Sequence, residues 1–439
     1  MIMYKAITIL QAAKEAEDQL GRPVVPVFWI AGEDHDFDEV NHVQTLSSKL
    51  EIDRIKLDAP GGARTSVSRS QIADWEPVLE ALEASLMDTE FKPELVGRLR
   101  EFANHSATLT DFFARMMGWL FGERGLVLLD SDDPELRLVE APMFDKLLDG
   151  QHAFSLSLEE NRAEVEALGF EPQAEIHEDC VNLFLFDEET GERYLLYRTE
   201  NGYADRKGGH RMTGEELKLL LDRSPQSFSN NVMTRPLMQD FLFPVLATVL
   251  GPGEISYWGL LCRGFAAFSM EMPILLPRNR HTLVEGTVRK HMQKYDLDFD
   301  AVFESFEARK EDWLKEQDEI GLEARFDEAK EKFRQLYNPI IDAVSEINPG
   351  MRKLGDVNLL KILEQMEFLE ARATDAHRSQ YEASIRQLDR IKLSLHPQNK
   401  PQERVYNVVA FLNKYGKDWL LELTDHKPEA WGTHRVVYL

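Results

Sequence analysis

Two short apolar segments, each followed at once by acidic residues, limit the folds open to this chain. Residues 24–30 read Val-Val-Pro-Val-Phe-Trp-Ile, and after Gly32 come Glu33, Asp34, His35, Asp36, Asp38 and Glu39. Residues 126–130 read Leu-Val-Leu-Leu-Asp and precede Ser131, Asp132, Asp133 and Pro134. A strand that is apolar at every position is buried on both faces, as in a parallel α/β sheet. Because such sheets bind ligands beyond the carboxyl ends of their strands, these acidic loops are predicted to form a site.

The overall charge and the cysteine content narrow the function classes. Among 439 residues, 51 basic side chains stand against 77 acidic ones, a net charge of −26. General nucleic-acid binders and anionic-membrane binders need a positive field, so we expect neither partner. Cys180 and Cys262 are too few for a disulfide framework or a cysteine-based zinc site. Without a long apolar stretch or a signal-peptide pattern, the sequence predicts a soluble, cytoplasmic protein.

Periodicity and turn signals give a coarse order of elements. Residues 1–20 have the pattern of an amphipathic helix, and a further helix over 112–120 is expected with Thr110 or Ser106 as its cap. Residues 181–186 and 193–198 form a predicted hairpin, and Thr213 with Glu216 forms a capping box. Between 228 and 282 we expect a very apolar helix over 237–250, a break at 251–254, a second helix over 255–270 and a short buried strand over 273–277.

The C-terminal third has a different pattern. Apolar residues recur at spacings of three and four from Leu322 to Ile347, and again from Leu359 to Ala376. Sustained spacing of this kind with charged flanks is typical of a coiled-coil seam. Asn348-Pro349-Gly350 separates the two series, so the sequence predicts an antiparallel helical hairpin. A final helix over 405–415 and an edge strand over 436–439 are expected after it.

Three sequence blocks together resemble a known family. They are residues 28–36 (Phe-Trp-Ile-Ala-Gly-Glu-Asp-His-Asp), residues 228–239 with 251–258 (Phe-Ser-Asn-Asn-Val-Met-Thr-Arg-Pro-Leu-Met-Gln and Gly-Pro-Gly-Glu-Ile-Ser-Tyr-Trp), and residues 401–406 with 412–416 (Pro-Gln-Glu-Arg-Val-Tyr and Leu-Asn-Lys-Tyr-Gly). The blocks are similar to those of the cysteine ligase of bacillithiol biosynthesis, the BshC family, and the resemblance covers the whole chain. It implies an α/β fold with a Rossmann-like parallel-sheet core, α+β insertions and a C-terminal antiparallel coiled-coil arm that forms a homodimer.

The resemblance also defines the expected domain boundaries. Core segments are predicted at 1–50, 106–150 and 228–294, with a helical connecting insertion at 51–105, an α+β connecting insertion at 151–227, the coiled-coil arm at 295–396, and a C-terminal segment that packs on the core at 397–439. The family carries a Gly-Gly-Gln-Gln block and a Thr-Gly-Pro before its first core helix. Residues 1–5 align with the middle of that helix, so we expect this form to lack the first strand and its glycine-rich turn.

The implied reaction adds cysteine to the amino group of glucosaminyl-malate through an amide bond. Such a step needs a neutral amine, and a positioned base can remove its proton. We therefore assign Asp34, His35 and Asp36 as the catalytic residues. The alternative is that these acids cap a short helix and favour its dipole, which is the role expected of Asp38 and Glu39. Ser131, Asp132 and Asp133 have the same two interpretations, with Asp132 or Asp133 as a cap before Pro134.

Further residues are predicted to bind the substrates. They are Glu33, Asn231, Arg235, Glu254, Tyr257, Trp258, Arg278, Asn279 and Arg280. Arg235 suits a malate carboxylate, because a guanidinium binds a carboxylate through two parallel hydrogen bonds. The alternatives are a surface loop around Arg235, a tight turn with aromatic packing at 251–258, and a solvated basic turn at 278–281.

Activation of the cysteine carboxylate points to ATP with magnesium, and the resemblance implies an ADP-type nucleotide site near the coiled coil. The sequence predicts no metal-ligand set, since no zinc spacing occurs. Two other functions stay open. One is a nucleotidyl or phosphoryl transferase on the same core, and the other is a non-catalytic scaffold of the thiol pathway. The residues do not decide the activation chemistry, the use of a metal or the role of dimerisation.

Overall fold

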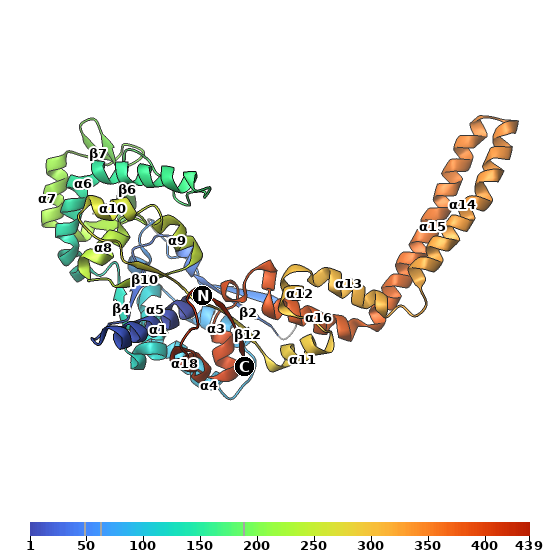
Figure 1. The fold of residues 1–439 in the computed structure, drawn as a ribbon, viewed down its shortest axis with the longest axis horizontal. Coiled ribbons are helices and arrows are strands. Elements are labelled where there is room, and N and C mark those ends of the chain that lie inside the picture. Colours follow the sequence, from blue (N-terminus) through green and yellow to red (C-terminus); the bar gives the residue numbers. More distant parts are fainter. Residues whose placement is uncertain (48–49, 62–63, 188) are drawn as a thin grey trace. The chain divides into compact units, whose positions relative to one another are not determined.

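A computed structural model describes residues 1–47, 50–61, 64–187 and 189–439, and divides them into two compact units. The core unit comprises 1–282, 403–437 and 439, and the arm unit comprises 283–402 and 438. Figure 1 shows strands and helices mixed in the core unit and helices alone over most of the arm unit. In the described part of the chain, no helix combines the length and the apolar character needed to cross a membrane.

The predicted parallel pairing of the two apolar strands is confirmed, but the second strand is less buried than expected, because Val127 is exposed. β1 (Val27–Ile30) pairs in parallel with β4 (Val127–Asp130), with Val27 opposite Val127 and Ile30 opposite Asp130. The first strand starts at Val27, three residues later than the apolar run. α1 (Ile2–Leu20) packs against β1 and against β10 (Ala247–Leu250), and it ends at Gly21, whose φ of 64° is left-handed.

The segment between these strands contains a hairpin that the sequence did not predict. β2 (His42–Leu46) and β3 (Ile52–Lys56) pair antiparallel, so the region 51–105 is not purely helical. The remaining elements there are α2 (Phe37–Val40), η1 (Val67–Arg69), α3 (Glu76–Ser85), α4 (Lys92–Asn104), α5 (Leu109–Phe121) and η2 (Gly122–Arg124). The cap of α5 is Thr108, not Thr110 or Ser106, because Thr108 and Asp111 exchange hydrogen bonds in a capping box.

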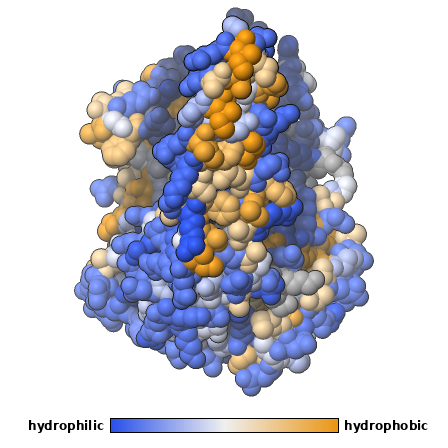
Figure 2. Space-filling model, turned by 90° about the vertical axis from the view of Figure 1, so that its right-hand side faces the viewer, coloured by the Kyte–Doolittle hydropathy of each residue, from blue (hydrophilic) through white to orange (hydrophobic). Residues whose placement is uncertain are grey.

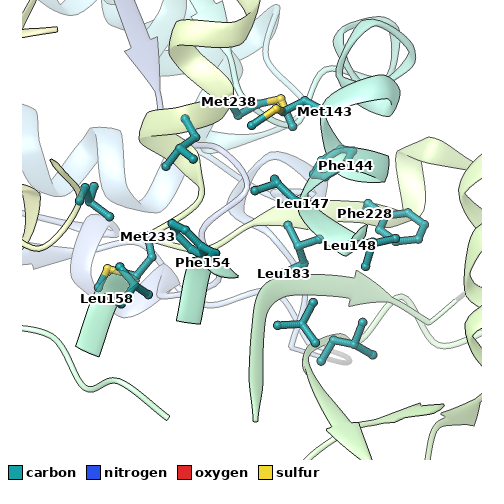
Figure 3. Close-up of a cluster of buried hydrophobic side chains, with 14 of the residues drawn as sticks. Met143, Phe144, Leu147, Leu148, Phe154, Leu158, Leu183, Phe228, Met233 and Met238 are labelled. Atoms are coloured by element: carbon teal, nitrogen blue, oxygen red, sulfur yellow. The ribbon is translucent and has the colours of Figure 1, made fainter. Parts of the chain in front are cut away.

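α6 (Pro134–Ala167) carries the buried face on which much of the core unit packs. Asp133 caps it, as predicted, by accepting a hydrogen bond from Glu135 N. The apolar cluster in Figure 3 brings α6 residues Phe144, Leu147 and Phe154 together with Leu183 and Phe228 from other elements. Side chains far apart in sequence thus pack into one apolar core around α6.

The strands of the α+β insertion form a five-stranded sheet in the order β8-β7-β6-β5-β9, and its last strand, β9, comes from the segment that the sequence placed in the core. Its strands are β5 (Cys180–Phe186), β6 (Arg193–Thr199), β7 (Gly202–Ala204), β8 (Arg211–Met212) and β9 (Phe228–Asn230), with α7 (Gly214–Arg223) and η3 (Pro225–Ser227) between the last two. The predicted hairpin is confirmed, since Phe186 pairs with Arg193 and Leu185 with Tyr194. The capping box of Thr213 and Glu216 is also present.

The expected helix over 237–250 is present only as far as Leu242, and the prediction is wrong for the residues after it. α8 (Arg235–Leu242) ends before Pro244, and the chain then forms β10, which pairs in parallel with β11 (Ile274–Pro277). A proline disfavours helical backbone in the residue before it, so Pro244 explains why the helix ends before Phe243. The second expected helix is two short ones, α9 (Pro252–Trp258) and α10 (Cys262–Ala267). The break expected at 251–254 is therefore the junction between β10 and α9, with Gly251 as the N-cap residue and 252–254 in the first turn of the helix. β11 is less buried than expected, because Ile274 is exposed.

After β12 (Arg280–Val284) the chain enters the arm unit, and it returns to the core unit at residue 403. The returning segment contains η5 (Gln402–Arg404), α17 (Val409–Tyr415), α18 (Asp418–Asp425) and β13 (His434–Tyr438). The helix expected over 405–415 begins at Val409, and the expected edge strand begins at His434. β13 forms a two-stranded sheet with β12.

The arm unit is helical and contains the predicted hairpin. Its elements are α11 (Gly286–Lys294), α12 (Phe299–Glu304), α13 (Phe306–Glu316), α14 (Leu322–Ile347), α15 (Gly350–Gln380), α16 (Glu382–Leu395) and η4 (Pro397–Asn399). α14 and α15 pack closely along their length, with Ile341 and Leu363 buried between them. Residues 283–294, which the sequence placed with the core, fold in this unit because Val288 and Met292 join the apolar cluster of α12 and α16.

Candidate functional site at the carboxyl ends of β1 and β4

The loops after β1 and β4 approach each other closely at Gly32. A Cβ atom on Gly32 would lie 1.9 Å from Ser68 Oγ and 2.1 Å from Asp130 Oδ1, so only glycine fits. Ser68 N donates to Gly32 O at 3.0 Å, and Ser68 Oγ donates to Asp130 Oδ2 at 2.6 Å. Burial raises the pKa of Asp130, and the Ser68 hydroxyl opposes the shift. Ser68 in η1 thus forms hydrogen bonds to the loop after β1 and to the last residue of β4.

A buried arginine on α6 connects the two loops. Arg137 donates to Glu33 Oε2 at 2.8 Å, pairs with Glu140 one turn away, and lies 3.6 Å from Asp132 Oδ1. All four side chains are at most 3% exposed. Burial opposes the charge of Arg137, but the three carboxylates hold its pKa above the ordinary value. We call Arg137, Glu33, Asp132 and Glu140 the Arg137 cluster.

The carboxylates of the Arg137 cluster are engaged by further donors. Arg69 donates to both oxygens of Asp132, at 2.9 and 3.1 Å, and Ser66 Oγ donates to Asp132 Oδ2. Asn230 N donates to Glu33 Oε2 at 3.2 Å. Glu140 has fewer partners, and burial raises its pKa to about 7 despite the neighbouring guanidinium of Arg137. Glu33 and Asp132 are thus ion-paired and buried.

His35 contacts Arg193, which lies at the start of β6. Arg193 Nη1 lies 3.0 Å from His35 Nδ1, while Arg193 Nε donates to Ser229 Oγ at 3.0 Å and Nη2 to Asn230 O at 2.8 Å. The guanidinium also stacks over the ring of Phe184 at 3.8 Å. Burial lowers the pKa of His35, and Arg64 and Arg193 lower it further against the opposing effect of Asp36 and Asp34.

Asp34 and Asp36, unlike Glu33, face solvent. Their side chains are 56% and 55% exposed. Asp36 pairs with Arg64 at 2.9 Å, and Asp34 lies 3.9 Å from Arg193. Asp36 occupies the N-cap position of α2, but its side chain makes no capping hydrogen bond. Asp38 and Glu39 lie in the first turn of α2, as the alternative interpretation expected.

The helix after β10, α9, contributes Glu254 and Tyr257. Glu254 accepts from Gly251 N at 2.7 Å and pairs with Lys5 at 2.7 Å. Burial raises the pKa of Tyr257, Arg235 opposes the shift, and Glu254 and Asp34 add to it. The charges of Arg235, Glu254 and Asp34 thus all act on the Tyr257 hydroxyl. Asn231, four residues before Arg235, donates to Asn182 Oδ1 at 2.8 Å and accepts from Met233 N and Thr234 N.

The other predicted binding residues lie elsewhere. Trp258 is buried and packs on Phe265. Arg278 is buried and donates to both carboxylate oxygens of Glu403, at 2.7 and 3.1 Å, while Asn279 is fully buried beside Thr8. Arg280 is half-buried in β12, where its N–H donates to Thr433 O. Arg278 is thus engaged by an ion pair and Trp258 by an apolar contact, whereas the interactions given for Asn279 and Arg280 involve their backbone N–H groups.

Sequence reasoning missed Arg137, Arg193, Arg69 and Lys5. For Arg137 a signal existed, because Arg137, Glu140, Phe144 and Leu147 recur at helical spacing, which places both charges on the buried face of α6. A charged pair on an apolar helix face implies burial with partners. Arg193 had no comparable signal, since it begins a strand of mixed polarity next to an acidic turn.

The arrangement does not form a ready metal site. Among the described residues, no group of three or more histidine, cysteine or acidic side chains could hold a metal ion. Glu33 and Asp132 are also occupied by arginines, which leaves few oxygen ligands of the kind that Mg²⁺ prefers. Cys180 is buried and its thiol pKa is raised by burial, whereas Cys262 is exposed.

Comparison with known proteins identifies similar sequences over the whole chain. The family model described as "Bacillithiol biosynthesis BshC, N-terminal Rossmann-like domain" matches residues 1–279, and the model described as "Bacillithiol biosynthesis BshC, C-terminal coiled-coil domain" matches residues 281–439. Proteins named "Putative cysteine ligase BshC" from Bacillus cytotoxicus and Bacillus cereus are each 35% identical, and one from Bacillus mycoides is 34% identical. Each alignment covers 100% of this chain and 81% of the relative.

Replacement of Arg137 tests whether its cluster holds the site together. Arg137→Met leaves three buried carboxylates without their shared cation, and breaking a buried ion pair in this way costs about 3–5 kcal/mol. We therefore expect a large fall in the midpoint of urea unfolding. Glu135→Gln, an exposed acid on the same helix, is the control and should leave the midpoint nearly unchanged.

Replacement of Glu140 gives a pH-dependent result of defined sign. The pKa of Glu140 is raised from 4.5 to about 7 in the folded protein, so protonation favours folding. This contribution is complete below pH 4.5 and is lost as pH rises toward 7. Relative to Glu140→Gln, wild-type stability should fall by about 3 kcal/mol over that range. Urea midpoints from pH 5 to 8 measure it, and parallel curves for the two proteins would contradict it.

Proposed function

The chain belongs to the BshC family of bacillithiol biosynthesis, and from this premise we propose that it joins cysteine to the amino group of glucosaminyl-malate through an amide bond. One structural observation supports the proposal most strongly. An imidazole and two exposed carboxylates, those of His35, Asp34 and Asp36, lie at the carboxyl end of a parallel strand, and the charges of Asp34 and Arg235 both act on Tyr257. Ligands of open α/β sheets bind at this edge.

The two exposed carboxylates suit the amine side of the reaction. Amide formation consumes a neutral amine, so the ammonium form of glucosaminyl-malate must lose a proton. Asp34 and Asp36 are open to solvent and lie on one short loop, where they can hold an ammonium group and accept its proton. The guanidinium of Arg235 is a matching partner for a malate carboxylate. These roles extend the proposal to individual residues.

The cysteine side of the reaction requires an activated carboxyl group, because a free carboxylate does not react with an amine. We extend the proposal to ATP as the co-substrate that activates it. The residues described above do not form a magnesium site, so no step is assigned to a metal ion bound by the protein. The ADP-type nucleotide site near the coiled coil stays a prediction.

We also propose that the protein acts as a cytoplasmic homodimer. Several large apolar side chains of α14 and α15 are exposed, namely Leu336, Ile340, Ile347, Met351, Leu354, Val357, Leu360, Phe368 and Leu369. Figure 2 shows an apolar stripe along this hairpin. Exposed apolar patches of this extent mark interaction surfaces, and a second copy of the same hairpin would cover them symmetrically. The unpaired thiols of Cys180 and Cys262 suit a reducing compartment.

The ligase proposal is tested by product formation. With cysteine, glucosaminyl-malate and ATP, we expect mass spectrometry to detect the amide product. Asp34→Asn should lower kcat/KM by about 10²–10⁴-fold if its carboxylate takes part in proton transfer. Asp88→Asn is the matched control, because Asp88 is a fully exposed acid that pairs with Lys92. Release of pyrophosphate or ADP without cysteine would instead favour the transferase alternative.

The dimer proposal is tested by the mass of the particle in solution. Light scattering should give twice the chain mass for the wild type and the chain mass for Leu354→Glu, since a charge in the apolar stripe opposes association. Leu219→Glu on α7 is the control, because Leu219 is a similarly exposed leucine of the core unit. A monomeric wild type would contradict the proposal. If Leu354→Glu abolishes thiol production in cells while Asp34→Asn does not, the scaffold alternative is correct.

A further inference from the structure

The contact between Arg193 and His35 joins two side chains with different hydrogen-bonding abilities. A guanidinium carries donors only and stays protonated in proteins. An imidazole nitrogen 3.0 Å from Arg193 Nη1 must therefore offer a lone pair. That nitrogen is Nδ1, so the single ring proton of His35 lies on Nε2. An imidazolium would place two N–H groups against each other, which excludes the charged form at this geometry.

Arg193 has little freedom to move away from the ring. Its side chain is 2% exposed, two further N–H groups are fixed by Ser229 Oγ and Asn230 O, and the guanidinium lies on the face of Phe184. Its backbone N–H is bound to Arg64 O at 3.0 Å. The start of β6 is thus anchored on two sides, and the donor it presents to His35 is preorganised.

The two arginines near His35 oppose a positive charge on its ring more strongly than the two nearby aspartates favour one. Arg64, in the loop before η1, and Arg193, in β6, disfavour a positive charge on the His35 ring. Asp36 and Asp34, on the same loop as His35, favour that charge less strongly. His35 Nε2 lies 3.9 Å from Asp36 Oδ1, which is beyond hydrogen-bond range, and 17% of the His35 side chain is exposed. Among the described residues, that carboxylate is the acid closest to pairing with Nε2. The Nε2–H group is therefore available to a ligand at the strand-end loop.

We propose that Arg193 is a positioning residue that holds His35 as the neutral Nε2–H tautomer, so that His35 donates a hydrogen bond to a carboxyl or acyl oxygen of the bound substrate and does not act as the base. The role in binding rests on the proposed ligase function, whereas the tautomer is a property of the resting protein. A fixed N–H donor suits an oxygen that gains negative charge as an amine attacks. The proton of the amine then goes to one of the two exposed carboxylates, Asp34 or Asp36, and the bond from the acyl carbon to the activating group that ATP supplied breaks as the amide bond forms.

Nuclear magnetic resonance of the full chain labelled with ring-¹⁵N histidine tests the tautomer directly. The chain has 12 histidines, and the His35 signals are those that disappear in His35→Gln or, if that variant does not fold, those displaced by Arg193→Lys. At pH 7.5 we expect an unprotonated Nδ1 and a protonated Nε2. An Nδ1–H tautomer, or a charged ring, would overturn the proposal. In Arg193→Met the two tautomers should mix and the pKa of His35 should rise toward its ordinary value, changes that a merely structural arginine would not cause.

Two substitutions at residue 35 test the donor role. A glutamine amide can place an N–H near the position of Nε2 but cannot serve as a base. His35→Gln should therefore keep kcat/KM within about tenfold of the wild type, while His35→Ala should lose about 10²–10³-fold, as for removal of one preorganised donor. Equal losses in the two variants would overturn the donor role. A wild-type protein with the expected tautomer but no product under any condition supports the tautomer and contradicts the ligase proposal alone.

Discussion

The buried guanidinium of Arg137 is the constraint on which the site depends. A charge that is removed from water must be paired, and here Glu33 from the loop after β1, Asp132 from the loop after β4, and Glu140 from the same helix supply the pairing. The cost of burying these groups is offset only while all of them keep their positions. The Arg137 cluster thus fixes two strand-end loops against α6.

Further hydrogen bonds join strands β6 and β9 to the loop after β1. Asn230 N at the end of β9 donates to Glu33, and Arg193 at the start of β6 binds the carbonyl of Asn230 and the ring of His35. The inner acid of the loop, Glu33, is therefore structural, and the outer residues Asp34, His35 and Asp36 are presented on a rigid base. This division separates the carboxylates that stabilise the fold from those that remain open to a ligand.

The sequence predicted the parts of the fold that have local signals. Continuous apolar runs identified β1 and β4, capping chemistry identified Asp133 and Thr213, and regular spacing identified the α14–α15 hairpin. The prediction failed where an apolar segment fits a helix and a strand equally well, since only Pro244 marks the change from α8 to β10.

For the site, the sequence predicted which loop carries the chemistry but not its partners. Glu33 and Asp34 are adjacent acids, yet Glu33 is buried in an ion pair with Arg137 and Asp34 is exposed. The sequence does not show this difference, because Arg137 lies 104 residues further along the chain. Arg278 and Asn279 follow a strand, as expected of ligand-binding residues, but Glu403 engages Arg278 from a distant segment. Such long-range pairings are determined by the fold and leave no local pattern.

We propose that the loops fixed by Arg137 and Arg193 form the substrate site. Hydrogen–deuterium exchange of the full chain, with and without glucosaminyl-malate, tests it most directly. Exchange should become slower on binding in residues 32–37, 229–235 and 251–258, with little change in the peptides of β2 and β3. Protection confined to segments outside these loops would contradict it.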